Sequence, residues 1–190
     1  MRLLLASKSP RRRQLLAAMD VPVAFVDVDV DEHLDADVDA SAKAELLARK
    51  KSMAYDVTQM SDGDVLVTAD TVVVHDGVAM GKPGTRGEAM AMLHDLSGRK
   101  HTVYTGVCLR SADQMVSFTE ATDVHFRSLG DDEIAYYVDH YRPYDKAGSY
   151  GIQEWIGMVG IERIEGCYYN VMGLPVARLY ETLMKRFSSR

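Results

Sequence analysis

A continuous apolar run at residues 65–74 constrains the fold of this chain more than any other feature of its sequence. Valine dominates the run, and a segment of this composition is typical of a strand that is buried on both faces of a sheet. The run is followed by Asp76-Gly77, a two-residue hairpin signal, which predicts that the chain returns as a short strand over Val78–Met80. We therefore predict a central strand with an antiparallel neighbour.

The rest of the chain alternates between strand patterns and helix patterns. Further strands are predicted at residues 3–6, 23–28, 102–109, 116–126 and 158–164, and helices at residues 9–19, 42–57, 85–96, 131–140 and 174–187. We expect the inward face of the second of these helices to carry Leu46, Leu47, Met53 and Ala54. This order predicts an α/β fold with a mixed sheet flanked by helices. The sequence has 190 residues and no internal repeat or linker, so we predict a single domain over residues 1–190.

Four cations lie at the predicted start of the first helix, in the stretch Ser7-Lys8-Ser9-Pro10-Arg11-Arg12-Arg13. Ser9 suits the N-cap and Pro10 suits the first helical position. The positive end of the helix dipole disfavours cations, whereas the free N–H groups of the same end favour an anion. The strand, loop and cationic helix start therefore predict a phosphate site, with a solvated basic turn as the alternative. The segment is not a P-loop, because G-x-x-x-x-G-K-[ST] is absent.

Asp70 lies inside the apolar run, where a charge is costly unless it is paired or binds a metal. Taken alone, it is explained equally well as the partner of a neighbouring lysine and as a catalytic carboxylate. A second acidic group, Asp29, Asp31 and Glu32, ends another predicted strand, and Gly81-Lys82-Pro83 holds a lysine in a rigid turn. Carboxylates together with lysines and arginines predict a site for a polyphosphate and a divalent cation such as Mg²⁺.

Two later segments have no single interpretation. The stretch Asp145-Lys146-Ala147-Gly148-Ser149-Tyr150-Gly151-Ile152-Gln153 has small residues that let a backbone approach a ligand, but taken alone it is better explained as an ordinary turn. Ser97-Gly98-Arg99-Lys100-His101 has the composition of a helix C-terminus, where we expect His101 at the surface or in a cap. The six histidines show no paired spacing such as H-E-x-x-H, so we predict no zinc site.

Composition excludes several classes of protein. The formal net charge of −6 argues against broad or stable binding to nucleic acid. No segment approaches the ~20 apolar residues of a membrane helix, and the N-terminal apolar run is too short for a signal peptide, so we expect a cytoplasmic protein that does not enter membranes. The two cysteines, Cys108 and Cys167, are expected to be reduced and in or near the core.

Five motifs, taken in order, resemble those of the Maf family of nucleotide pyrophosphatases. They are Leu5-Ala6-Ser7-Lys8-Ser9-Pro10-Arg11-Arg12, Ala69-Asp70-Thr71-Val72-Val73, Gly81-Lys82-Pro83, Leu96-Ser97-Gly98 and the stretch from Asp145 to Gln153. The similarity extends from the first predicted strand to the last predicted helix. It implies a Maf/Ham1-like fold with two lobes around a central cleft, a divalent metal cofactor (Mg²⁺ or Mn²⁺), and hydrolysis of nucleoside triphosphates to monophosphate and pyrophosphate.

The resemblance also implies roles for individual residues. Asp70 matches the family's proton acceptor, and Asp70 and Glu32 are the expected metal partners. The expected catalytic set is Asp70, Lys51, Lys82 and Glu32, and Ser7 and Arg11 are expected to bind phosphate. Arg12, Thr71 and Gln153 match the three residues that read the base in the branch acting on dTTP and UTP.

The sequence departs from the family pattern at two places. Glu154 and Trp155 stand where many relatives have glycine and a small residue, and Lys50 is an alternative to Lys51. Two other functions stay open. One is a pyrophosphatase for modified or non-standard nucleotides, such as 7-methyl-GTP or deaminated purines, and the other is a non-catalytic regulator of cell division. Nucleoside triphosphates are the expected partners, and the resemblance is compatible with a homodimer without determining it.

Overall fold

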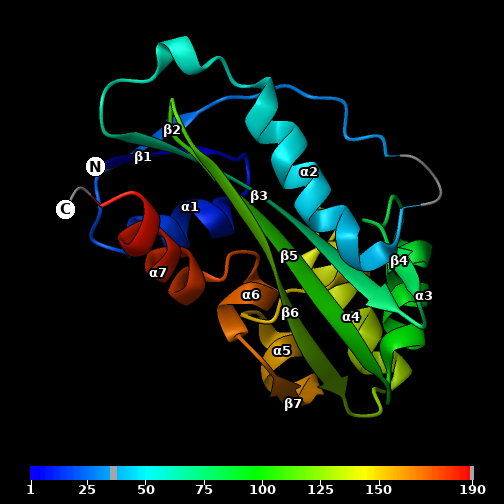
Figure 1. Ribbon diagram of the computed structural model, residues 1–190. Coiled ribbons are helices and arrows are strands. Elements are labelled where there is room, and N and C mark those ends of the chain that lie inside the picture. Colours follow the sequence, from blue (N-terminus) through cyan, green and yellow to red (C-terminus); the bar gives the residue numbers. More distant parts are fainter. Residues whose placement is uncertain (35–37, 189–190) are drawn as a thin grey trace. The chain divides into compact units, whose positions relative to one another are not determined.

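Strand β3 (Asp64–His75) lies inside the mixed sheet of this computed structural model, which describes residues 1–34 and 38–188 (Figure 1). Within those ranges the sheet has seven strands, and the other six are β1 (Arg2–Ala6), β2 (Val23–Val26), β4 (Val78–Met80), β5 (Lys100–Arg110), β6 (Met115–Phe126) and β7 (Ile161–Glu165). Their order is β2-β1-β3-β5-β6-β7, with β4 paired to β3. Strand β1 is parallel to β2 and β3, whereas β4 and β7 are antiparallel to β3 and β6.

Helices flank this sheet, which confirms the predicted α/β class. They are α1 (Pro10–Ala17), α2 (Ala40–Ala54), α3 (Arg86–Leu96), α4 (Asp131–Tyr141), α5 (Trp155–Gly160), α6 (Tyr168–Met172) and α7 (Val176–Arg186), with short 3-10 turns η1 (Val57–Gln59) and η2 (Ala147–Ser149). None of the helices in the described ranges is both long and apolar enough to cross a membrane.

Internal contacts divide the chain into two compact units. The first comprises Met1–Asp70, Thr105–Glu120 and Gly173–Arg190, and the second comprises Thr71–Tyr104 and Ala121–Met172. In the first unit, Leu66 of β3 packs with Leu4 and Ala6 of β1, and Leu4 and Leu66 are register partners. Alternate residues point to opposite faces of a strand, so the fully buried Val67 lies on the other face. Burial on both faces explains why this part of β3 is apolar throughout.

The buried face of α2 differs from the predicted one. Helix α2 packs against β5 within the first unit, and its buried residues are Ala44, Ala48 and Ser52. Leu46 and Met53, which were expected to face inward, are 40% and 60% exposed. The reason is a close approach to β5, where a Cβ on Gly106 would lie 2.2 Å from the backbone N of Glu45. Only small residues fit at such a contact.

Local signals place most elements of the second unit as predicted. Asp76 and Gly77 both have positive φ, 48° and 78°, and they join β3 to β4 in a two-residue turn. Thr85 caps α3 by accepting a hydrogen bond from the N–H of Glu88. One strand prediction is wrong in part, because residues 155–160 form helix α5 and the strand begins only at Ile161.

The core of the second unit lies around Val73, Val103 and Val124. His101, expected at the surface or in a cap, is instead buried, with its Nε2 2.7 Å from the Tyr150 hydroxyl oxygen. Burial lowers the pKa of His101 to about 3, so its ring is neutral and belongs to the core. Both cysteines are free, Cys108 buried and Cys167 half-buried, as predicted.

Candidate active site

Asp70 faces helix α2 because of the alternation along β3. Leu66, Thr68 and Asp70 are two residues apart and therefore share one face of the strand. On that face, Thr68 Oγ1 donates a hydrogen bond of 2.6 Å to the carbonyl of Ala48 in α2. Lys51 lies one helical turn after Ala48, and its Nζ is 2.7 Å from Asp70 Oδ1. The same packing that fixes α2 on the sheet thus brings lysine and aspartate together.

Lys51 also binds a second carboxylate. Its Nζ lies 2.8 Å from Oε1 of Glu32, in the segment that follows β2. The side chains of Lys51 and Asp70 are 14% and 15% exposed, whereas that of Glu32 is 57% exposed. Lys50, the alternative lysine, donates instead to the carbonyl of His33. The structure therefore groups Lys51, Asp70 and Glu32 at the solvent-accessible edge of the first unit's core.

Arg12 lies beside this group. Its Nε donates to the Gly173 carbonyl at 2.8 Å and its Nη1 to the Ala69 carbonyl at 2.9 Å. Burial lowers the pKa of Arg12 below its ordinary value, and the negative charges of Asp70 and Glu32 act in the opposite direction. The guanidinium is thus anchored by backbone oxygens next to the carboxylates.

The start of α1 forms as predicted. Ser9 is the N-cap and its Oγ accepts from the N–H of Arg12, while Ser7 Oγ accepts from the N–H of Ser9 at 3.2 Å. Arg11 lies in the first turn, and its charge contributes to lowering the pKa of Arg12. Arg13 is engaged elsewhere, since its Nε donates to the Ser7 carbonyl and its guanidinium lies 4.9 Å from the centre of the Phe25 ring. Among the four cations that the sequence places at this helix start, Arg13 therefore has a structural role.

The remaining predicted residues belong to the second unit. Lys82 is exposed, next to the buried Pro83, and the Gly81 carbonyl accepts a hydrogen bond of 3.1 Å from the N–H of Gly148. Gly148 has a φ of 68°, and a Cβ there would meet Val73 Cγ1 at 3.1 Å. Positive φ and close packing explain the glycine, and the hydrogen bond ties the lysine turn to the glycine-rich loop.

Gln153 ends that loop, and Thr71 directly follows Asp70 in β3. Oε1 of Gln153 is buried and has no hydrogen-bond partner among the residues that the structure describes. A buried acceptor without a partner is costly, so this atom is suited to a donor from a ligand. Thr71 points to the face of the strand opposite to that of Asp70.

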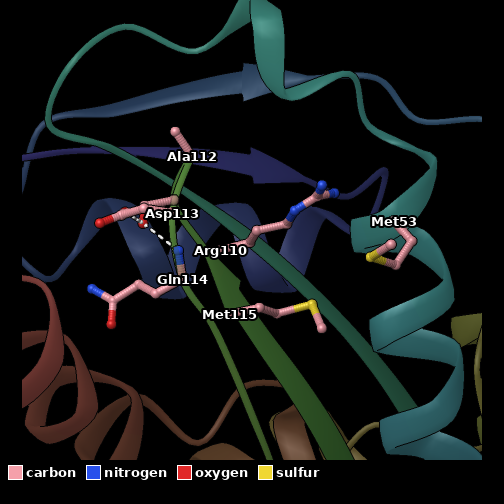
Figure 2. Close-up of a pocket in the computed structure, with 7 residues that line it drawn as sticks. Met53, Arg110, Ala112, Asp113, Gln114 and Met115 are labelled. Carbon is pink, nitrogen blue, oxygen red and sulfur yellow. Dashed lines mark hydrogen bonds between the residues drawn. The ribbon is translucent and has the colours of Figure 1, made fainter.

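A separate hollow of about 200 Å³ lies in the first unit, between Met53 of α2 and the turn that joins β5 to β6 (Figure 2). Its two charged side chains already have partners. Arg110 donates to the Ser52 carbonyl, and Asp113 accepts from the Ser111 hydroxyl. None of the predicted site residues lines this hollow, so it is not the candidate active site.

Comparison of the sequence with known proteins points to one family. The family model described as "Maf-like protein" matches residues 2–186. A dTTP/UTP pyrophosphatase of Parabacteroides distasonis is 52% identical over 184 residues, which cover 96% of this chain and 94% of that protein. A protein of the same name from Bacteroides fragilis is 48% identical over 183 residues, which cover 96% of this chain and 94% of that protein. Another from Christiangramia forsetii is 38% identical over 187 residues, which cover 98% of this chain and 95% of that protein. Among solved structures, the Staphylococcus aureus Ham1 protein aligns with a TM-score of 0.47 and 13% identity, over 66% of this chain and 72% of that one.

Proposed function

Since this chain belongs to the Maf family, we propose that it is a pyrophosphatase that hydrolyses dTTP and UTP to the monophosphate and pyrophosphate. The names of relatives at 48% and 52% identity support the choice of substrate. The observation that carries the chemistry is the contact of Lys51 with both Asp70 and Glu32.

Asp70 is the proposed proton acceptor. Hydrolysis of a phosphoric anhydride requires an oriented water, a base for its proton, and relief of charge on the leaving group. A carboxylate has two oxygens with about four acceptor positions, so Asp70 can accept from Lys51 through Oδ1 and still orient a water. Lys51 holds the carboxylate in one orientation, which a base near a reacting phosphorus needs.

Lys51, Arg11 and Lys82 are the proposed partners of the triphosphate, together with the Ser7 hydroxyl. In the first unit, Lys51, Arg11 and Arg12 supply three positive charges around the carboxylates of Asp70 and Glu32. A polyanion is attracted to such a group, and the N-terminal N–H groups of α1 add donors for phosphate oxygens. Lys82 lies in an exposed turn of the second unit, where its ammonium is free to follow a flexible phosphate chain.

Asp70 and Glu32 fit a divalent cation such as Mg²⁺ or Mn²⁺. Their carboxylates already converge on one positive charge, the Lys51 ammonium. Mg²⁺ is usually held by one or two carboxylates, with water and substrate phosphates as the other ligands. The described residues contain no group of three or more His, Cys, Asp or Glu side chains placed to hold a metal. When bound, the ion would polarise phosphate oxygens and neutralise charge on the pyrophosphate.

Gln153 is the proposed reader of the base, with Arg12 and Thr71 as the other specificity residues. A side-chain amide can accept from N3–H of uracil or thymine and donate to O4 at the same time. The unpaired Oε1 of Gln153 supports this role because it needs a donor. Cytosine and adenine present the reverse order, a ring-nitrogen acceptor beside an amino donor, and would leave an amide held in this orientation incompletely paired, at a cost of about 1–3 kcal/mol for each buried unsatisfied group.

Product analysis of the purified protein tests this proposal. We expect dTTP and UTP to give monophosphate and pyrophosphate, and Asp70→Asn, which keeps the shape and removes the base, to lower turnover by at least ~10²-fold. Asp62→Asn, the same change at an exposed position just before β3, is the control and should retain wild-type turnover. Diphosphate and orthophosphate as first products, or near-normal turnover by a folded Asp70→Asn protein, would contradict the proposed chemistry. A preference for GTP, 7-methyl-GTP or ITP would contradict the base assignment alone.

A further inference from the structure

A partly buried carboxylate directly follows the proposed base-reading residue. Glu154 occupies the N-cap position of α5, yet its side chain, 19% exposed, makes no capping hydrogen bond. An acid at an N-cap ordinarily accepts from the first turn of the helix. The Glu154 carboxylate instead accepts from the Tyr137 hydroxyl through Oε2 and pairs with Lys146, whose Nζ is 3.0 Å from Oε1. A feature other than helix capping therefore accounts for the direction of this side chain.

Tyr137 connects the two ends of the segment that carries Gln153. It is fully buried in α4, and its hydroxyl donates to Glu154 while accepting from the N–H of Gly151 at 3.1 Å. Burial and the neighbouring Glu154 raise the pKa of Tyr137 well above its ordinary value, so the hydroxyl keeps the proton that it donates. One hydroxyl thus holds the residues on either side of Ile152 and Gln153.

Gly151 brings the amide and the carboxylate onto the same stretch of backbone. A Cβ at this position would lie 3.0 Å from Gln153 Nε2 and 2.9 Å from Glu154 Cδ. Both side chains therefore pack against the glycine, in the space that any other residue would fill. The terminal torsion of a glutamine has broad minima, so its neighbours decide which way the amide points.

We propose that Tyr137 and Glu154 are positioning residues that set base selectivity by fixing the orientation of the Gln153 amide. This inference rests on the proposed function, because it assigns to these residues the support of the base-reading group. Discrimination between bases depends on a donor and an acceptor being presented in a fixed order, and an amide that turns freely presents both orders. Loss of the support therefore lowers selectivity for dTTP and UTP without removing the catalytic group.

The test compares Tyr137→Phe with Tyr136→Phe, which is the same loss of one hydroxyl at the preceding, exposed residue of α4. Values of kcat and KM for dTTP, UTP and CTP are measured from monophosphate formation. Cytosine has the same ring size but presents the reverse order, with N3 as acceptor and its N4 amino group as donor, so we expect Tyr137→Phe to lower the ratio of kcat/KM for dTTP to that for CTP at least about tenfold, and Tyr136→Phe to leave it within about twofold. Glu154→Gln, which keeps the shape and removes the charge that pairs with Lys146, should lower the ratio in the same direction. In a Gln153→Ala background, Tyr137→Phe should have no further effect on the ratio.

Equal losses of kcat/KM for dTTP and CTP would show that Tyr137 has only a structural role, and an unchanged ratio would show no role in selectivity. Either result overturns the inference. If Tyr137→Phe does not fold, Glu154→Gln is judged by the same two criteria. A wild-type protein that releases no pyrophosphate from dTTP or UTP contradicts the proposed function, whereas a selective wild type with equally selective variants contradicts this inference alone.

Discussion

Replacing Gly106 with alanine tests the close packing of α2 on β5. The new Cβ would lie 2.2 Å from the Glu45 backbone N and 2.3 Å from the carbonyl carbon and oxygen of Ala44. These are backbone atoms, so no side-chain rotation relieves the overlap and the helix itself must move. Overpacking of this kind costs about 1–3 kcal/mol, and in a chain of this length each kcal/mol lowers Tm by about 2–4 °C. We therefore expect Tm to fall by roughly 2–12 °C.

Scanning calorimetry of the purified variant measures this change, and Gly87→Ala is the matched control. Gly87 lies in α3, where a Cβ would meet no atom of another element within 4 Å, and alanine favours a helix over glycine by about 0.5–1 kcal/mol. The control should keep or slightly raise Tm. Gly106→Ala should also lower turnover, because movement of α2 displaces Lys51 from Asp70. A Gly106→Ala protein with wild-type Tm and turnover would refute the packing argument.

Three further outcomes are expected. Arg12→Lys should destabilise the fold by about 1–3 kcal/mol in urea titrations, because an ammonium cannot span the carbonyls of both Gly173 and Ala69 as the guanidinium does. Arg127 holds the pKa of Glu133 at about 2, so this pair's stabilisation is complete above the unfolded pKa of ~4.3 and is lost as the pH falls towards about 2. The difference in unfolding free energy between wild type and Glu133→Gln should therefore shrink between about pH 4 and pH 2. Addition of EDTA should abolish dTTP turnover and excess Mg²⁺ or Mn²⁺ should restore it; turnover that persists in chelator would exclude the metal.

Elements with local determinants could be predicted from the sequence. The apolar run of β3, the Asp76-Gly77 turn and the Ser9 cap of α1 each depend on residues that are close together in the chain. The Lys51 and Asp70 contact could be inferred only through a family resemblance, because it joins a helix to a strand 19 residues later. Local sequence patterns do not predict a contact between residues this far apart in the chain.

The face of α2 could not be predicted, because hydrophobicity is a poor guide where a helix lies very close to a sheet. Ala44, Ala48 and Ser52 are buried for their small size, and the larger apolar residue Met53 is displaced to the surface. The missing signal lay in Gly106, on a strand far later in the chain than Ala44 and Glu45, whose lack of a side chain permits the close approach. Tyr137 was missed for a similar reason, since nothing in the helical pattern of α4 indicates that its hydroxyl reaches Gly151 and Glu154.

The sequence left two explanations of Asp70 open. It could be the partner of a neighbouring lysine or a catalytic carboxylate, and its contacts in the structure help to distinguish them. The aspartate is paired with Lys51, and a purely structural pair would need nothing more. Lys51, however, also binds Glu32, whose side chain is 57% exposed and comes from a segment outside the regular elements. An ion pair as exposed as this contributes little to stability, and a second carboxylate beside the first adds repulsion. Folding therefore explains the contact of Lys51 with Asp70 but not the presence of Glu32, and an exposed carboxylate beside a partly buried one suits the proposed cation, which would arrive with its phosphate ligand.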